Sequence, residues 1–131
     1  MKTDTYDWDQ VALADIARVT YAARQGEVAE RGITPEGLEE MFRENFAEAA
    51  PTFSLASLDD ELIGLLLLYR LSPTSVALNP GQILGGHPAV VPGSDGKKVA
   101  SGLIQEAIAW AQNEGIEQLE LTIPMVEQDV L

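Results

Sequence analysis

Residues 90–123 read VVPGSDGKKVASGLIQEAIAWAQNEGIEQLELTI, and this stretch decides the fold. Apolar side chains recur at helical spacing in its middle part, which predicts an amphipathic helix over residues 97–114. Gly115 is a typical left-handed stop for that helix, and the alternation over residues 116–123 predicts a strand. Together with a strand over residues 83–91, the pattern predicts a right-handed crossover between parallel strands.

A β-hairpin is predicted upstream of this unit. Residues 53–56 alternate in polarity and indicate a strand, and Asp59-Asp60 indicates a turn. Residues 62–71 are apolar on both faces, so this strand should lie inside a sheet that is covered on both sides. Residues 72–81 should form a loop. The strand over residues 83–91 contains two glycines and a proline, which predict a bulge or local splaying.

Two helices should precede the hairpin. Residues 8–30 carry apolar side chains at helical spacing. Thr34 and Pro35 suit the cap and the first turn of a second helix, which Pro51 ends. The predicted order is therefore α-α-β-β-β-α-β, an α/β (α+β) domain in which helices flank a mixed central sheet.

The composition suits one globular domain over residues 1–131, with residues 1–7 and 125–131 as tails. Apolar residues make up 46% of the 131 residues, enough for one core. There is no cysteine, which excludes disulfides, thiolate metal sites and cysteine nucleophiles. The start of the chain has no basic stretch followed by an apolar one, and no apolar run is long enough to cross a bilayer. We expect a cytoplasmic protein without a membrane partner.

The charge of the chain is strongly negative. Its 21 acidic and 8 basic residues give a formal net charge of −13, which disfavours binding to nucleic acid. After Arg70 the only basic residues are Lys97 and Lys98, at the start of the predicted helix. This pair either binds an anion or is a solvated first turn. With one histidine and no cysteine, no metal site is expected, and Asp59-Asp60-Glu61 is better explained as a turn.

Several segments resemble the GNAT superfamily of acyl-CoA-dependent acyltransferases, over roughly residues 8–124. Residues 59–65, DDELIGL, resemble the turn and the apolar strand with an early glycine in its second hairpin. Val90-Val91-Pro92 resembles the end of its fourth strand. Residues 96–114 resemble its cofactor helix, and residues 115–121 its fifth strand.

The resemblance implies acyl transfer from a co-substrate, in the first place acetyl-CoA, to a small-molecule or peptide amine. In this family the strands on either side of the cofactor helix splay apart, and pantetheine pairs with the free backbone of the first. The pyrophosphate lies on backbone N–H groups at the N-terminus of the helix, where the helix dipole favours negative charge. The cofactor contacts implied for this chain are Ala89, Val90, Val91, Gly96, Lys97, Lys98, Val99 and Ala100.

The chain departs from the family pattern in two ways. The phosphate loop normally has Gln or Arg, two free positions, Gly, one free position, then Gly or Ala. One alignment places Asp95, Lys98 and Ala100 there, and an alternative places Lys97, Ala100 and Gly102 there but needs a longer loop and a later helix start. The family also continues after its fifth strand with a helix and two strands, so this chain looks C-terminally short.

His87 is the candidate catalytic residue. It is the single histidine, and a near-neutral imidazole can take a proton from an attacking amine, although a lone histidine is more often structural. No Asp or Glu lies between Glu61 and Asp95, so the usual strand carboxylate base is missing. Tyr69 is either a proton donor or a packing residue.

Two functions follow from the sequence. The first is an N-acyltransferase, most simply an N-acetyltransferase, that acts on an unidentified amine. The alternative is a non-catalytic GNAT-like module that binds CoA or acts through a subunit interface. An open sheet edge at residues 117–123 also predicts pairing with a second copy, that is, a homodimer.

Overall fold

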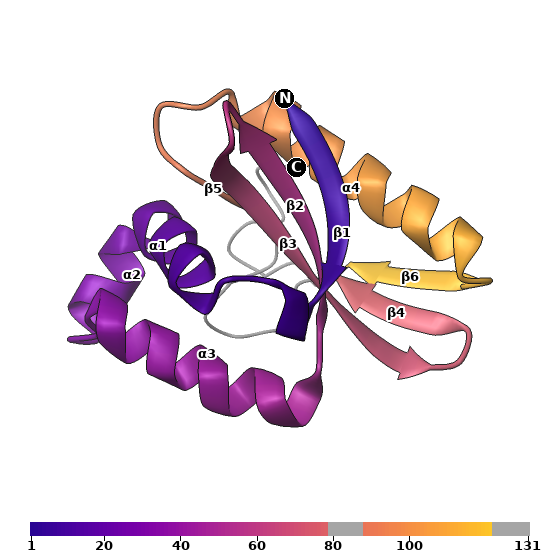
Figure 1. Cartoon of the computed structure of the whole chain (residues 1–131), viewed down its shortest axis with the longest axis horizontal. Helices are drawn as coiled ribbons and strands as arrows, with labels where there is room; N and C mark the ends of the chain where they lie inside the picture. The colour runs from indigo at the N-terminus through magenta and orange to yellow at the C-terminus, as the bar shows by residue number, and fades with distance from the viewer. Residues whose placement is uncertain (79–87, 122–131) are drawn as a thin grey trace.

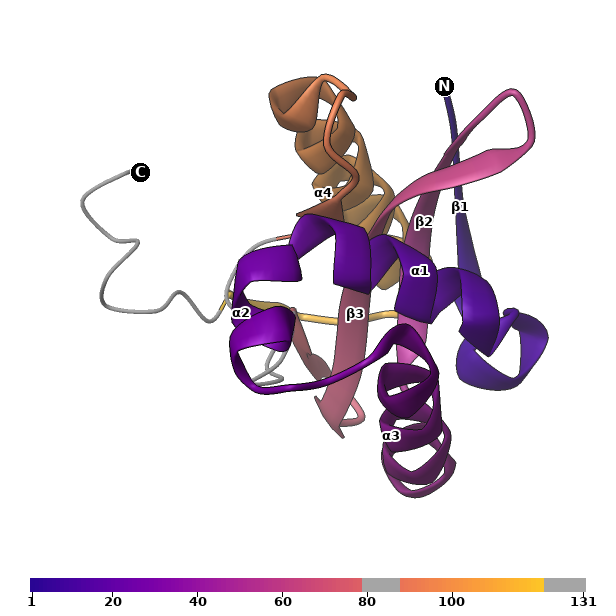
Figure 2. The ribbon, with the colours of Figure 1, turned by 90° about the vertical axis from the view of Figure 1, so that its left-hand side faces the viewer.

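A mixed β-sheet forms the centre of the molecule, with α1–α3 on one face and α4 on the other (Figure 1 and Figure 2). The computed structural model describes residues 1–78 and 88–121. The strands are β1 (Lys2–Asp7), β2 (Thr52–Leu58), β3 (Glu61–Ser72), β4 (Ser75–Leu78), β5 (Ala89–Val90) and β6 (Gln118–Leu121). The helices are the 3₁₀ turn η1 (Trp8–Gln10), α1 (Leu13–Ala23), α2 (Gln25–Glu30), α3 (Pro35–Ala49) and α4 (Gly96–Asn113). The predicted fold class is confirmed.

The sheet order is β1-β2-β3-β4-β6, and β5 pairs with β3. Neighbouring strands are antiparallel except for β4 and β6, which are parallel. The ladder between β2 and β3 skips Ile63 between the partners of Ala56 and Ser57, so Ile63 is the extra residue of a β-bulge. This bulge lies directly before Gly64 and Leu65, the residues of β3 that pair with β5.

β3 lies between two apolar clusters and contributes side chains to both. One of its faces, with Leu65 and Leu67, packs against α1 and α3. The other face, with Leu66 and Leu68, packs against α4. All four leucines are buried, as expected for a strand that is apolar on both faces.

The expected tail over residues 1–7 is wrong, because Lys2–Asp7 forms β1 and pairs with β2 along its whole length. The hydroxyls of Thr3 and Thr5 donate hydrogen bonds to the carboxylate of Glu106 on α4, at 3.4 and 3.2 Å. The face that β1 turns toward α4 is therefore polar. This explains why the segment lacks the apolar alternation by which a strand is recognised.

The other differences between the predicted and the observed structure concern where helices and strands begin and end. The single helix expected over residues 8–30 is divided into η1, α1 and α2, and the expected loop over residues 72–81 contains β4. The strand expected over residues 83–91 is observed only as β5, at Ala89–Val90. Residues 83–87 of this expected strand and the expected tail over residues 125–131 lie outside the described ranges. The helix predicted over residues 97–114 is confirmed as α4. Within the described ranges, no helix combines the length and the apolar character needed to cross a bilayer.

Candidate functional site

The strands before and after α4 diverge. β5 pairs with β3 at Gly64 and Leu65, whereas β4 pairs with β3 further along, over Leu68–Ser72. β6 pairs with β4 and, in the part of the chain that the structure describes, not with β5. The parallel partner of β6 is thus β4 rather than the strand directly before α4. β5 and β6 lie well apart in Figure 1, and β5 keeps one edge without a described partner strand.

Val90 presents its backbone at that open edge. The amide of Val91 donates to the carbonyl of Ile63 at 2.9 Å. This hydrogen bond establishes which residues of β5 are hydrogen-bonded to β3 and which are not. In an antiparallel pair, residues that exchange hydrogen bonds with the neighbouring strand alternate with residues whose amide and carbonyl point away from it. Val90, opposite Gly64, is of the second kind, so its N–H and C=O point away from β3.

A tight loop connects β5 to α4. The amide of Ser94 donates to the carbonyl of Val91 at 3.4 Å, and Gly93 has a φ of +90°, a left-handed conformation that glycine adopts at little cost. α4 then begins at Gly96. This helix start agrees with the first alignment to the family's phosphate pattern, in which Asp95 takes the place of Gln or Arg.

Asp95 is the N-cap of α4. Its carboxylate accepts a hydrogen bond from the amide of Lys98 at 3.2 Å, and its carbonyl accepts one from the amide of Val99 at 2.9 Å. Aspartate is among the best N-cap residues because it satisfies amides that have no helical partner. Among the described residues, the amides of Gly96 and Lys97 have no acceptor.

The side chains of the predicted contacts divide into two groups. Lys97 and Lys98 are exposed, and no ion pair of theirs occurs within the described ranges. Ala89 and Val99 are buried in the two apolar clusters, so a ligand at this place could meet only their backbone. Val90, Val91 and Ala100 are half-buried and Gly96 is exposed. The helix start therefore offers two free amides and two lysines.

Gly64 allows the first turn of α4 to approach the sheet closely. A Cβ atom at this position would lie 2.7 Å from Cγ1 of Val99 and 3.2 Å from Cδ1 of Leu103. The carbonyl oxygen of Ala89 in β5 is also within 3.4 Å of that point. The early glycine of β3 thus holds the N-terminus of α4 against β5, where the free backbone edge lies.

A groove of about 500 Å³ runs along the β5–α4 loop. α1 contributes Arg18 to it, and Arg18 was not among the residues predicted from the sequence. The guanidinium of Arg18 donates to the carbonyl of Leu62 at 3.1 Å and lies 3.8 Å from the carboxylate of Glu61. The approach of α1 to this loop is a long-range contact, so no local sequence signal could have revealed it.

The two candidate proton-transfer residues have different outcomes. His87 lies outside the described residues and stays a prediction. Tyr69 packs against the cluster formed with α1 and α3, and its hydroxyl donates to Oδ1 of Asn45 at 3.5 Å. Desolvation by burial raises the pKa of Tyr69, so this hydroxyl keeps its proton at neutral pH. The geometry is that of a packing residue.

Comparison with protein families gives one match, to the acetyltransferase (GNAT) family, over residues 13–128. The chain belongs to the GNAT family. The match covers most of the chain, from the start of α1 past β6. No sequence among the curated proteins matches this GNAT chain.

Solved structures agree with the GNAT fold. A probable acetyltransferase has a TM-score of 0.70 at 18% identity, with 99% of this chain and 83% of that chain covered. A ribosomal-protein-alanine N-acetyltransferase from Brucella melitensis biovar Abortus 2308 has a TM-score of 0.65 at 20% identity, with 98% and 85% covered. A GNAT family acetyltransferase from Brucella melitensis, in complex with acetyl-CoA, has a TM-score of 0.64 at 17% identity, with 98% and 81% covered. At these identities the likeness concerns the fold.

Proposed function

We propose that this GNAT chain transfers an acyl group, in the first place acetyl, from acyl-CoA to an amine. The observation that carries the proposal is the backbone of Val90, whose N–H and C=O have no partner among the described residues, at the edge where β5 and β6 diverge. Membership of the family supports it, as does the fold shared with an acetyltransferase that binds acetyl-CoA.

Pantetheine is a chain with two amide groups, and it needs backbone partners spaced as in a β-strand. The N–H and C=O of Val90 supply one such pair at an edge that no described strand occupies. The pyrophosphate would lie at the start of α4, against the free amides of Gly96 and Lys97. Lys97 and Lys98 add positive charge there in a chain whose net charge is −13.

The proposed reaction needs positioning more than it needs covalent chemistry from the protein. The amine nitrogen attacks the thioester carbonyl carbon, a C–N bond forms and the C–S bond breaks. The sulfur leaves as a thiolate. An acceptor that arrives as an ammonium ion loses one proton to solvent before its nitrogen attacks, and the second proton lost by the nitrogen balances the proton that the thiolate takes up. Fixing the thioester beside the amine lowers the entropic part of the barrier. His87 stays the predicted base.

The acceptor class follows from charge. Amines are protonated at neutral pH, and a chain with 21 acidic and 8 basic residues attracts cations. A cationic small molecule or peptide is therefore the proposed acceptor.

One observation favours the alternative, a non-catalytic GNAT-like module that binds CoA weakly or acts through a subunit interface. The carboxylate of Asp95 caps α4 and occupies the amide of Lys98. It competes with phosphate for the same helix start and repels it. If this competition dominates, the chain keeps the fold without productive cofactor binding.

Calorimetric titration of the full chain with acetyl-CoA tests the proposal. We expect binding of the intact protein and a loss of about tenfold or more in the Lys97→Glu/Lys98→Glu variant, because each change replaces a phosphate-binding cation with an anion. The Lys2→Glu/Arg31→Glu variant is a matched control, since it makes the same charge change at two exposed residues elsewhere. Absence of acetyl-CoA binding by the intact chain overturns the proposal.

A measurement of catalytic turnover distinguishes an acyltransferase from a module that only binds CoA. Thiol release from acetyl-CoA can be followed over a panel of primary amines, with His87→Ala as the test of the predicted base. Tight acetyl-CoA binding without thiol release for any amine would support the module.

A further inference from the structure

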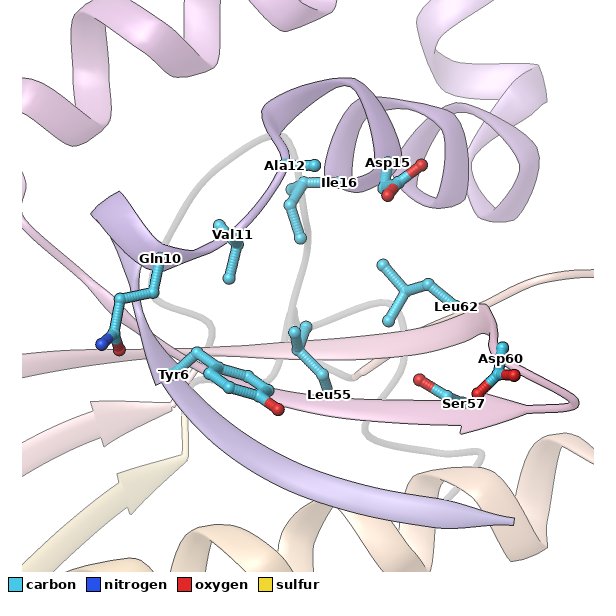
Figure 3. A pocket seen from close by; sticks show the side chains of 10 residues that line it. All are labelled: Tyr6, Gln10, Val11, Ala12, Asp15, Ile16, Leu55, Ser57, Asp60 and Leu62. Atoms are coloured by element: carbon cyan, nitrogen blue, oxygen red, sulfur yellow. The ribbon is translucent and has the colours of Figure 1, made fainter.

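A second groove, of about 220 Å³, lies between α1 and the outer half of the sheet (Figure 3). Its lining residues are Tyr6, Gln10, Val11, Ala12, Asp15, Ile16, Leu55, Ser57, Asp60 and Leu62. None of them belongs to β5, to the β5–α4 loop or to β6, although Leu62 also lines the groove along that loop. The two grooves are therefore neighbours, and this one does not include the residues proposed to hold acyl-CoA. Its volume is enough for a ligand of several heavy atoms.

The middle of the groove is apolar. Ile16 of α1 points down toward the sheet, and Leu55 of β2 and Leu62 of β3 lie below it, as Figure 3 shows. At one end the ring of Tyr6 lies along the floor, and the Tyr6 residue is 39% exposed. A groove of this kind binds the hydrocarbon part of a ligand through burial of apolar surface.

Two carboxylates from different elements stand at the other end. Asp15 projects from α1, Asp60 projects from the β2–β3 turn, and the hydroxyl of Ser57 lies beside Asp60 in Figure 3. Within the described ranges, neither carboxylate has an ion pair or a hydrogen bond. Asp15 and Asp60 are exposed, so they can meet a ligand from solution.

In the described structure, Arg18 makes no ion pair with the carboxylates at this end. Arg18 lies one turn after Asp15 on α1, at a spacing that permits an ion pair on a helix. Its guanidinium instead donates to the carbonyl of Leu62 and lies beside Glu61. Arg18 lines the other groove with Asp59 and Glu61 and is not among the residues that line this one, although its partner Leu62 lines both.

We propose that this groove binds a small organic ammonium ion with an apolar body. The ammonium group would lie between the carboxylates of Asp15 and Asp60, with the Ser57 hydroxyl as a further acceptor. The hydrocarbon would cover Leu55, and its far end would face the ring of Tyr6. The apolar middle of the groove, the aromatic ring of Tyr6 and the two carboxylates together favour this class of ligand over neutral or anionic ligands.

Phenethylammonium is a suitable probe, because it combines one ammonium group with an aromatic body of the right size. 2-Phenylethanol is its neutral counterpart and 3-phenylpropionate its anionic one. We expect chemical-shift changes on titration with phenethylammonium at the amides of residues 12–16 and 55–62, and much weaker binding of the other two compounds.

Charge variants locate the ammonium group. Asp15→Asn and Asp60→Asn should each weaken phenethylammonium binding by about threefold or more, since each removes one partner of an exposed ion pair. Asn also suits the left-handed backbone of residue 60, whose φ is +64°, so the turn is preserved. Asp59→Asn is the matched control: it makes the same charge change in the same turn, at φ +53°, but residue 59 lines the other groove.

Three outcomes would overturn the proposal. They are no shift at these amides at millimolar phenethylammonium, equal binding of 2-phenylethanol, or an Asp59→Asn variant that weakens binding as much as Asp60→Asn. The readout needs neither acetyl-CoA nor turnover, so its failure is distinguishable from failure of the proposed acyltransferase activity.

Discussion

The carboxylate of Asp95 accepts a hydrogen bond from the backbone amide of Lys98, at 3.2 Å. The first anion at the start of α4 is thus a side chain of the protein itself. In the first alignment to the GNAT phosphate pattern, Asp95 takes the position of Gln or Arg. The same contact stabilises the helix and opposes binding of phosphate, and the two effects can be separated by substitution.

Asp95→Asn should raise the affinity for acetyl-CoA by about fivefold, or ~1 kcal/mol, because it removes one negative charge close to the pyrophosphate. Asparagine caps a helix nearly as well as aspartate, so thermal stability should change little. Calorimetry with acetyl-CoA measures the gain. Pantetheine, which lacks the phosphates, is the control ligand and should bind both proteins equally. Weaker acetyl-CoA binding by Asp95→Asn would contradict this account.

Gly64→Ala should destabilise the protein by about 1–3 kcal/mol, because the new methyl group would stand 2.7 Å from Val99 in a packed cluster. Urea denaturation measures the change. Gly26→Ala is the control: its methyl group would meet nothing within 4 Å, and in the helix α2 it should stabilise by about 0.4–1 kcal/mol. A Gly64→Ala variant as stable as the wild type would show that α4 does not depend on this close approach.

Tyr69 should make the protein lose stability in alkali. Its pKa in the folded state is raised above the ordinary value of 10.0, so its contribution is fully present below pH 10 and is lost as pH rises through the folded pKa. Urea midpoints measured from pH 9 upward should therefore fall more steeply for the wild type than for Tyr69→Phe. Parallel curves for the two proteins would indicate that the Tyr69 hydroxyl does not contribute to this loss.

The homodimer stays a prediction, and the two sheet edges differ in their suitability for it. β1 carries the charged residues Lys2, Asp4 and Asp7, which disfavour pairing at an edge. β6 pairs with β4 on one side and, within the described ranges, has no strand on the other. Light scattering over a hundredfold concentration range should show a mass that approaches twice 14.1 kDa. A constant monomer mass would refute pairing through β6.

The parts of the fold that the sequence predicts are those whose signal is local. α4 has an uninterrupted apolar stripe and a capping residue, and its observed bounds differ from the predicted ones by one residue at each end. β3 is apolar on both faces because two layers cover it, and that pattern is visible without knowledge of its partners.

The elements that the sequence does not predict depend on contacts with residues that are far away in the chain. β4 has four residues and exists through its pairing with β3 and with β6, which follows some forty residues later. β1 is polar on the side of α4 because Glu106 accepts from its threonines. At the candidate site, the sequence indicates Asp95 as a departure from the family pattern in the first alignment, and its role as N-cap depends on where α4 begins.

β3 is the only described strand whose buried leucines serve both apolar clusters, and this couples the two helical layers. Its backbone pairs with β2 on one side and with β4 and β5 on the other, so its amide groups exchange hydrogen with solvent only when these pairings open. We therefore expect the amides of Leu65–Leu68 to be the slowest to take up deuterium, at a rate set by unfolding of the whole molecule. The layer of α1–α3 and the layer of α4 each cover one face of the same strand, so unfolding of β3 exposes the apolar side of both layers.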